Sequence, residues 1–190
     1  MRQKDVELEV KILEIDKRAL FRELKVMGAK AKGERQIVTY FFDTPERTLQ
    51  KKKQILRLRQ DGGKVLLAFK APKGAFRQEI EFGVSDFKKA KKFLEVLGFE
   101  PTLKTVKKRA SFKLDGAEVD IDEYLGELSF IPPFMEVEAE NRKILDDYVQ
   151  KFQKFGRAVH WSTAELIAYY QNKQKESRLH MCFDARKEEI

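Results

Sequence analysis

Cysteine and histidine are nearly absent from this chain of 190 residues, which has one cysteine and two histidines. Cys182 has no second cysteine to pair with, so an intramolecular disulfide is excluded and the reducing cytoplasm is the expected compartment. His160 and His180 have no cysteine or histidine neighbour at ligand spacing, which argues against a zinc site.

Long apolar runs are also missing. No stretch approaches the roughly 20 residues that a membrane-spanning helix requires. Residues 1–5 lead directly into alternating charged and apolar positions, which predicts that the chain carries no signal peptide. We therefore expect a cytoplasmic protein that does not contact a membrane.

Charge is what the sequence has in abundance. Charged residues make up 37% of the chain, against about a quarter in an ordinary domain, and the net charge is +8. This surplus suggests an anionic partner, which is nucleic acid, an acidic membrane surface or a small polyanion such as a nucleotide. Much of it lies in runs such as Lys51-Lys52-Lys53, which are usually solvated, so charge alone does not choose among these partners.

The length fits one domain with a full hydrophobic core. We expect this domain to span residues 1–175, followed by a polar C-terminal tail, residues 176–190, that lacks a clear period. Capping side chains and terminating glycines predict helices. They span 16–28, 85–98 and 141–156, and a fourth runs from Thr163 toward Lys175.

Eight strands are predicted between these helices from their two-residue alternation. They span 5–14, 35–42, 54–60, 64–71, 76–83, 104–114, 117–123 and 134–140. Asp61-Gly62-Gly63 and Asp115-Gly116 are hairpin signals, so the sheet is expected to be mainly antiparallel.

One face of these strands is apolar and the other is charged. In the first strand Glu7, Glu9 and Lys11 share a face, because successive side chains alternate. The same division recurs at Arg57 and Arg59, Glu79 and Glu81, Asp120 and Asp122, and Glu136 and Glu138. Periodicity alone leaves two folds open: a sheet with its charged face in water, or a barrel closed around that face as a polar lumen.

The segment Glu7-Leu8-Glu9-Val10-Lys11 aims two carboxylates and an ammonium group at one point. This E-x-E-x-K pattern resembles the signature of the CYTH superfamily, which includes class IV adenylyl cyclases, thiamine triphosphatases and other tunnel triphosphatases. Further matches follow in the family's order over about residues 5 to 170: Tyr40 to Pro45 (Y-F-D-T-P), Leu56 to Arg59 (L-R-x-R), Lys70, Arg77 with Glu79 and Glu81, Lys107 with Arg109, Asp122, and Phe134 to Glu138 (F-x-E-I-E).

The resemblance implies an α+β fold, an eight-stranded closed antiparallel β-barrel that forms a triphosphate tunnel, with helices packed outside. Within the second match, Asp43-Thr44-Pro45 is interpreted as a structural turn, because Thr before Pro favours extended backbone and Asp can cap the turn.

Lumen-facing cations are the candidate phosphate ligands, since guanidinium forks and lysine ammonium groups match the oxygens of a compact polyanion. These are Lys11, Arg57, Arg59, Lys70, Arg77, Lys107 and Arg109. For Arg77, Glu79, Glu81 and Asp120, salt bridges across the lumen are an equal alternative.

Carboxylates in the same lumen would repel a triphosphate unless cations lie between them. Mg²⁺ and Mn²⁺ prefer oxygen ligands, so either ion is the expected cofactor. The candidate metal ligands are Glu7, Glu9, Asp122, Glu136 and Glu138. The resemblance also implies catalytic roles for Glu9 and for Lys11, which the family uses beside a hydrolytic water.

We expect a metal-dependent enzyme that transfers a phosphoryl group from a small-molecule triphosphate. Attack by water would make it a triphosphatase, and attack by the ribose 3′-hydroxyl on the alpha phosphorus would make it an adenylyl cyclase. Trp161-Ser162-Thr163 stands where cyclase-like members often carry Arg-Ser-Tyr, which favours hydrolysis.

Two other functions were weighed. A non-catalytic polyphosphate or nucleotide binder would keep the same lumen. Nucleic-acid binding is disfavoured, because no strand face interleaves aromatic with basic residues. A monomer and a homodimer are both compatible with the sequence.

Overall fold

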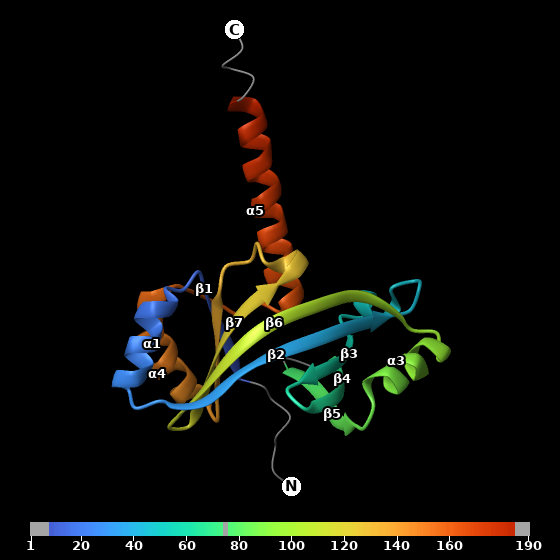
Figure 1. Ribbon diagram of the computed structural model, residues 1–190, viewed down its shortest axis with the longest axis horizontal. Coiled ribbons are helices and arrows are strands. Elements are labelled where there is room, and N and C mark those ends of the chain that lie inside the picture. Colours follow the sequence, from blue (N-terminus) through green and yellow to red (C-terminus); the bar gives the residue numbers. More distant parts are fainter. Residues whose placement is uncertain (1–7, 74–75, 185–190) are drawn as a thin grey trace.

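The computed structural model describes residues 8–73 and 76–184, which form nine strands and five helices (Figure 1). The strands are β1 (Glu9–Leu13), β2 (Lys30–Asp43), β3 (Ile55–Asp61), β4 (Lys64–Lys73), β5 (Phe76–Val84), β6 (Glu100–Leu114), β7 (Ala117–Leu125), β8 (Phe134–Ala139) and β9 (Arg157–Val159). Eight of them match the predicted strands. The short β9 was not predicted.

The helices are α1 (Lys17–Val26), α2 (Thr48–Lys51), α3 (Phe87–Val96), α4 (Arg142–Phe152) and α5 (Thr163–Asp184), with two 3₁₀ turns, η1 (Gly126–Leu128) and η2 (Gln153–Phe155). Asp16 and Asn141 cap α1 and α4 as predicted, each accepting a backbone N–H from three residues on. Ser85 was predicted to open α3, and this is wrong by one residue, because Asp86 accepts the Lys89 N–H at 3.0 Å.

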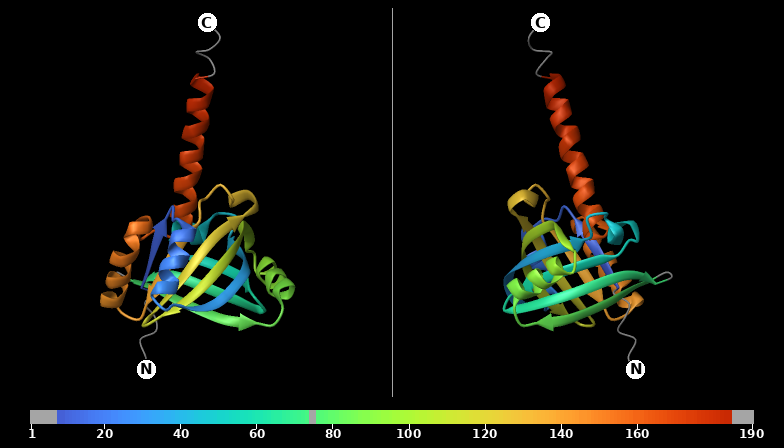
Figure 2. Two further views of the ribbon diagram at one scale, coloured as in Figure 1. Left: turned by 60° about the vertical axis from the view of Figure 1, so that its left-hand side comes forward. Right: turned by 90° about the vertical axis from the view of Figure 1, so that its right-hand side faces the viewer.

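All strand neighbours are antiparallel, in the order β5-β4-β3-β2-β6-β7-β8-β1-β9. Two-residue loops join β3 to β4 and β6 to β7, at the predicted Asp-Gly hairpin signals. The sheet curves around its charged face, so strands pass in front of and behind one another in Figure 2. The expected α+β fold, an antiparallel sheet with helices outside, is confirmed, with nine strands in place of eight.

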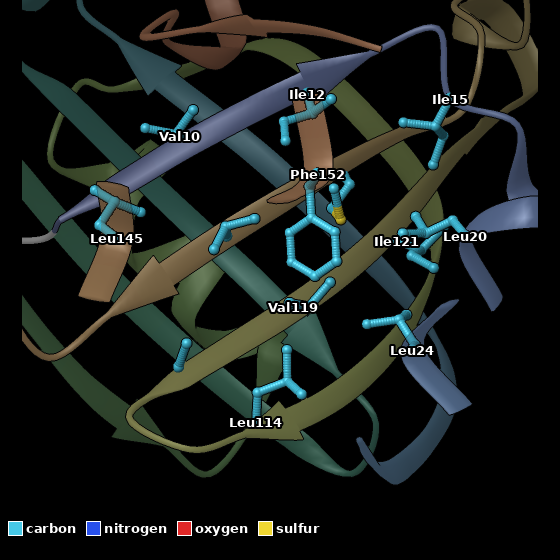
Figure 3. Close-up of a cluster of buried hydrophobic side chains, with 13 residues drawn as sticks. Val10, Ile12, Ile15, Leu20, Leu24, Leu114, Val119, Ile121, Leu145 and Phe152 are labelled. Atoms are coloured by element: carbon cyan, nitrogen blue, oxygen red, sulfur yellow. The ribbon is translucent and has the colours of Figure 1, made fainter. Parts of the chain in front are cut away.

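The apolar face of the sheet forms the core beneath α1 and α4. Figure 3 shows Phe152 of α4 between Val119 of β7 and Ile12 of β1, with Leu20 and Leu24 of α1 beside them. Phe152 is fully buried, as is Leu20. Each such side chain stabilises the fold by roughly 1.5–3 kcal/mol through removal of apolar surface from water. Because the apolar face packs against α1 and α4, the charged face lies on the inner side of the curved sheet.

The helix predicted to run from Thr163 toward Lys175 continues without a break to Asp184. Its first half packs through Leu166, Ile167 and Tyr170, and its second half projects away from the sheet (Figures 1 and 2). Gln, Lys and Glu favour helix even without an apolar stripe, which is why a segment that lacks a period is helical. The part of the chain that the structure describes contains no helix long and apolar enough to cross a membrane.

Candidate active site

Lys11 lies at the centre of the charged inner face. On β1 it is paired with Glu136 of β8, and its side chain binds Glu136 at 3.2 Å and Glu9 in a closer contact. Lys11 is only 6% exposed. Burial alone would lower the pKa of the Lys11 ammonium, but Glu136 and Glu9 together raise it well above its ordinary value. Lys11 is therefore a fixed cation.

Arg109 of β6 binds three carboxylates from two neighbouring strands. Its Nε and Nη2 donate to Asp122 at 2.7 and 2.6 Å, its Nη1 donates to Asp120 at 2.5 Å, and Nη2 also contacts Glu136. Asp122 has no exposed surface and also forms an ion pair with Lys107. Burial would lower the pKa of Arg109, but Glu136 and Asp122 hold it well above the usual range.

Glu136 is the acidic hub of this wall. It lies against Lys11, Lys107 and Arg109. Burial alone would raise the pKa of Glu136, but the three cations, with Lys107 contributing most, hold it well below its ordinary value. The carboxylate is therefore ionised at any physiological pH.

The opposite wall, on β3 and β4, carries the cations Arg57, Arg59 and Lys70. Arg57 reaches Glu79 at 3.1 Å, and Arg59 reaches Glu81 at 3.1 Å. Lys70, 8% exposed, binds Glu79 at 3.0 Å. The Nε–H groups of Arg57 and Arg59 are buried and have no hydrogen-bond partner among the described residues.

Arg59 is further destabilised in its charged form. Burial lowers its pKa first, and repulsion from Arg57 and from Arg109 lowers it too. Cations of the two walls therefore lie close enough to repel each other across the inner face. Unmet N–H donors and mutual repulsion between guanidinium groups both favour the binding of an anion.

The structure thus brings ten of the predicted site residues onto one inner face: Glu9, Lys11, Arg57, Arg59, Lys70, Lys107, Arg109, Asp122, Glu136 and Glu138. Arg77 lies at a register position opposite Pro72, and its side chain is outside the part of the chain that the structure describes. Glu7 lies outside the described residues. Glu79, Glu81 and Asp120 make the salt bridges that were weighed as the alternative role for them.

The carboxylates of the inner face are the type of ligand that a hard divalent ion prefers. Glu9 and Glu138 are direct partners across β1 and β8, and two carboxylates so placed repel unless a cation lies between them. Their oxygen donors are those that Mg²⁺ and Mn²⁺ prefer. The described residues form no group of three or more Asp, Glu, His or Cys arranged to hold a metal. Glu9, Asp122 and Glu136 are bound by Lys and Arg side chains. A bound ion would share Glu9 and Glu136 with Lys11.

Several polar residues of the inner face were missed. Arg35 of β2 donates a hydrogen bond to Ser111 of β6 at 2.7 Å. Thr39, a ladder partner of Arg59 and of Thr105, is buried, as is Thr105. Strand alternation already put Arg35 and Ser111 on the charged face of their predicted strands. No sequence pattern distinguished these hydroxyl groups and this single arginine from ordinary polar residues of a strand, so they were not predicted as site residues.

An apolar cluster closes off one end of the charged face. Leu13, Tyr124 and Phe134 continue the inward-facing positions of their strands and pack on Leu166 and Ile167 of α5. The Lys107 ammonium group lies 6.0 Å from the centre of the Phe134 ring, so the charged part of the inner face directly borders this apolar cluster. Burial, followed by the charges of Glu136 and Asp122, raises the pKa of the Tyr124 phenol, which therefore stays neutral.

Asp43 has the structural role expected of it. Its carboxylate accepts the N–H groups of Thr44 at 2.7 Å, Leu49 at 2.8 Å and Gln50 at 2.9 Å, and it is 5% exposed. These bonds tie the end of β2 to α2. The turn thereby sets where β3, with its two arginines, enters the sheet.

The sequence matches the family model described as CYTH domain over residues 5–170. It is 26% identical over 155 residues to "Putative adenylate cyclase MJ0240" of Methanocaldococcus jannaschii, an alignment that covers 76% of this chain and 86% of that protein.

Solved structures share the fold. A "putative adenylate cyclase" from Vibrio parahaemolyticus aligns with a TM-score of 0.70 at 21% identity, covering 87% of this chain and 99% of that one. The PH1819 protein of Pyrococcus horikoshii OT3 aligns at 0.66 and 24%, covering 86% and 98%. HpAC1 from Hippeastrum, described as having a dominant triphosphatase activity, aligns at 0.63 and 14%, covering 87% and 95%.

Proposed function

The chain belongs to the CYTH domain family, and from that premise we propose that it is a divalent-metal-dependent triphosphatase. The observation that carries the proposal is the pair of buried, unpartnered Nε–H groups on Arg57 and Arg59, which face the inner side of the sheet. A buried donor without a partner costs about 1–3 kcal/mol. A phosphate chain that enters the tunnel would satisfy both donors and relieve the repulsion between the guanidinium groups.

The cations would divide the triphosphate between the two walls. Arg57, Arg59 and Lys70 bind it from β3 and β4, and Lys107 and Arg109 bind it from β6. Planar guanidinium groups contact two oxygens at once, which fixes the orientation of the phosphate chain as well as its position. Such orientation, with charge neutralisation, is most of what a protein contributes to phosphoryl transfer.

Lys11 would act as a cation and not as a base, since its ammonium group stays protonated between Glu9 and Glu136. From there it donates a hydrogen bond to the attacking water. Glu9, which accepts from Lys11, would take up the proton that this water loses. A bound Mg²⁺ or Mn²⁺, held by Glu9, Glu136 and Glu138, would supply charge neutralisation at the reacting phosphate.

Hydrolysis is favoured over cyclisation by the segment before α5. The guanidinium group of Arg157 lies 4.9 Å from the ring centroids of Trp161 and of Tyr169. The Ser162 N–H donates to the Glu165 carboxylate at 2.7 Å, and the Glu165 N–H donates to the Ser162 hydroxyl at 3.3 Å. These contacts support a structural role for the segment in which cyclase-like members often carry Arg-Ser-Tyr. The triphosphatase activity named for HpAC1 agrees with this choice. Adenylyl cyclase is the second candidate, because the similar archaeal and Vibrio proteins carry that name.

The decisive experiment incubates the protein with tripolyphosphate, ATP or thiamine triphosphate, each with Mg²⁺ or Mn²⁺, and resolves the phosphorus-containing products. Orthophosphate release supports the triphosphatase, and cyclic AMP with pyrophosphate supports the cyclase. Binding without turnover by any of the three would leave only a binding protein. Residues 1–175 are proposed as the catalytic unit and the cytoplasm as its location, and its state as a monomer or homodimer stays a prediction.

A further inference from the structure

A chain of hydrogen bonds connects the β3–β4 hairpin to Arg109 through two residues that have no assigned role. Arg35 of β2 is the direct ladder partner of Arg109. Its Nε binds Asp61 at the end of β3, and its Nη1 donates to the Ser111 hydroxyl at 2.7 Å. Arg35 is thus held on one side by a carboxylate and directed on the other at a serine.

Ser111 connects Arg35 to Asp120 through its hydroxyl group. Ser111 is 1% exposed, and a hydroxyl has a single proton to donate. Because Ser111 accepts from Arg35, its proton is directed to Asp120, which the structure pairs with it. Asp120, as a carboxylate, can only accept, so the Ser111 hydroxyl is held between a donor, Arg35, and an acceptor, Asp120.

Asp120 in turn holds one end of Arg109. It accepts Nη1 at 2.5 Å, while Asp122 accepts Nε and Nη2 from the other edge. The guanidinium group is clamped at both ends. An arginine side chain that is free to rotate loses conformational entropy when it binds, and a clamped one has already lost it.

We propose that Arg35 and Ser111 are positioning residues for Arg109: they fix Asp120 so that the guanidinium group of Arg109 is already oriented when a triphosphate enters. This rests on the proposed function, in which Arg109 binds phosphate. The effect is on affinity and orientation, and neither residue touches the reacting atoms.

The competing interpretation is that Arg35 binds phosphate itself. It has the charge for this role, but two of its donor groups are engaged by Asp61 and Ser111. Direct binding would make the Ser111 hydroxyl dispensable. If the two residues position Arg109, they act through one chain of hydrogen bonds. Removal of either residue should then weaken phosphate binding as much as removal of both.

The test is a double-mutant cycle on tripolyphosphate binding with Mg²⁺ by calorimetry, together with the kinetics of orthophosphate release. Ser111→Ala and Arg35→Met should each weaken binding about tenfold, and the double variant should be no weaker than the more impaired single one. Ser111→Thr keeps the hydroxyl and should restore binding to near the wild-type level. Arg35 is 33% exposed in its side chain, so Arg35→Met keeps the test open even if Ser111→Ala does not fold.

Lys32→Met is the matched control. Lys32 is also a cation of β2 with its own carboxylate, Glu118, but no hydrogen bond connects it to Arg109 among the described residues. Its loss should leave tripolyphosphate affinity unchanged. Equal losses for Lys32→Met and Arg35→Met would indicate a general charge effect and overturn the proposal, as would wild-type affinity in Ser111→Ala or additive losses in the double variant.

A second readout separates this inference from the function on which it rests. Exchange of the Arg109 guanidinium protons, followed by NMR without any ligand, should be slow in the wild type and faster in Ser111→Ala. If the wild type neither binds nor cleaves tripolyphosphate, the proposed function fails, and the exchange rates still decide whether Ser111 orients Arg109. Equal exchange rates in the two proteins would refute the positioning role.

Discussion

Glu9 of β1 and Glu138 of β8 are direct partners across the ladder, so two carboxylates share one face of neighbouring strands. Opposed like charges destabilise a sheet. A divalent ion bound by both carboxylates would offset this repulsion, beside Lys11, which pairs with Glu9. The same two residues therefore link the stability of β1 to the chemistry of the site.

We predict that Glu9→Gln and Glu138→Gln each lower turnover at least about 100-fold, because each removes an anionic ligand from the ion that neutralises charge in the transition state. The change is nearly isosteric, so both variants should remain folded, although Glu9→Gln also removes one of the two carboxylates that pair with the buried Lys11. Initial rates over a Mg²⁺ titration check this.

Glu118→Gln is the control for that pair. Glu118 is the partner of Glu138 on its other side, but it is partly exposed and bound to Lys32. Its loss should change the rate less than about fivefold, since exposed ion pairs contribute ~1 kcal/mol or less. A wild-type rate in Glu9→Gln or Glu138→Gln at all Mg²⁺ concentrations would remove that residue from the metal site.

Tripolyphosphate together with Mg²⁺ should raise the melting temperature more than either does alone. The two satisfy the orphan donors of Arg57 and Arg59 and the opposed carboxylates at the same time. At a ligand concentration 100 times Kd, selective binding to the native state adds ~2.7 kcal/mol, which corresponds to about 5–10 °C for a chain of this size.

High salt distinguishes the tunnel from the surface in these melts. Binding to the exposed run Lys51-Lys52-Lys53 would need no metal and would be lost with added salt, because surface charges are screened. Binding in the tunnel should survive moderate salt and be abolished in Arg57→Met with Arg59→Met. A shift that is independent of metal and erased by salt would count against the tunnel.

Much of this site was predictable because strand alternation is a local property. Once a strand is recognised, its backbone decides that Arg57 and Arg59, or Lys107 and Arg109, face the same way. The charged face was therefore readable before any pairing was known. Helix starts were readable for the same reason, since Asp16 and Asn141 act on amides three residues away.

Contacts that depend on strand register were not predictable. Arg35 and Ser111 are 76 residues apart, and only the pairing of β2 with β6 brings them together. The strand β9 has three residues, too few for alternation to indicate, and it forms because β1 offers it an edge. Ser85 and Asp86 are both capping residues, so the choice between them depended on how the chain leaves β5.

Asp43 should make the protein acid-sensitive. Burial alone would raise its pKa, but three backbone N–H groups lower it below the ordinary value of about 3.9. A group whose pKa is lower in the folded state stabilises the fold above its unfolded pKa, and this stabilisation is lost as pH falls through the folded pKa. Asp43→Asn should lose about 1–2 kcal/mol at pH 7 and flatten the stability profile below pH 5. Urea unfolding from pH 7 to 3 measures both, and a parallel decline of the two proteins would show that Asp43 does not titrate on unfolding.

The last prediction concerns Gly156, where β9 meets β1. A Cβ at this position would lie 2.1 Å from the backbone carbonyl oxygen of Leu13, and a carbonyl in a ladder cannot move aside as a flexible side chain can. Gly156→Ala should therefore push β9 away from β1 and destabilise the fold by about 2 kcal/mol or more.

Gly63 is the matched control, because a Cβ there meets nothing within 4 Å. Gly63→Ala should change stability by less than about 1 kcal/mol, with a small gain possible from the loss of unfolded-state freedom. Lys11 pairs with Val159 in the β1–β9 ladder, so displacing β9 should also lower turnover in Gly156→Ala. Equal unfolding free energies for the two variants would mean that β9 can be displaced without loss of stability. In that case β9 does not stabilise β1, the strand that carries Lys11.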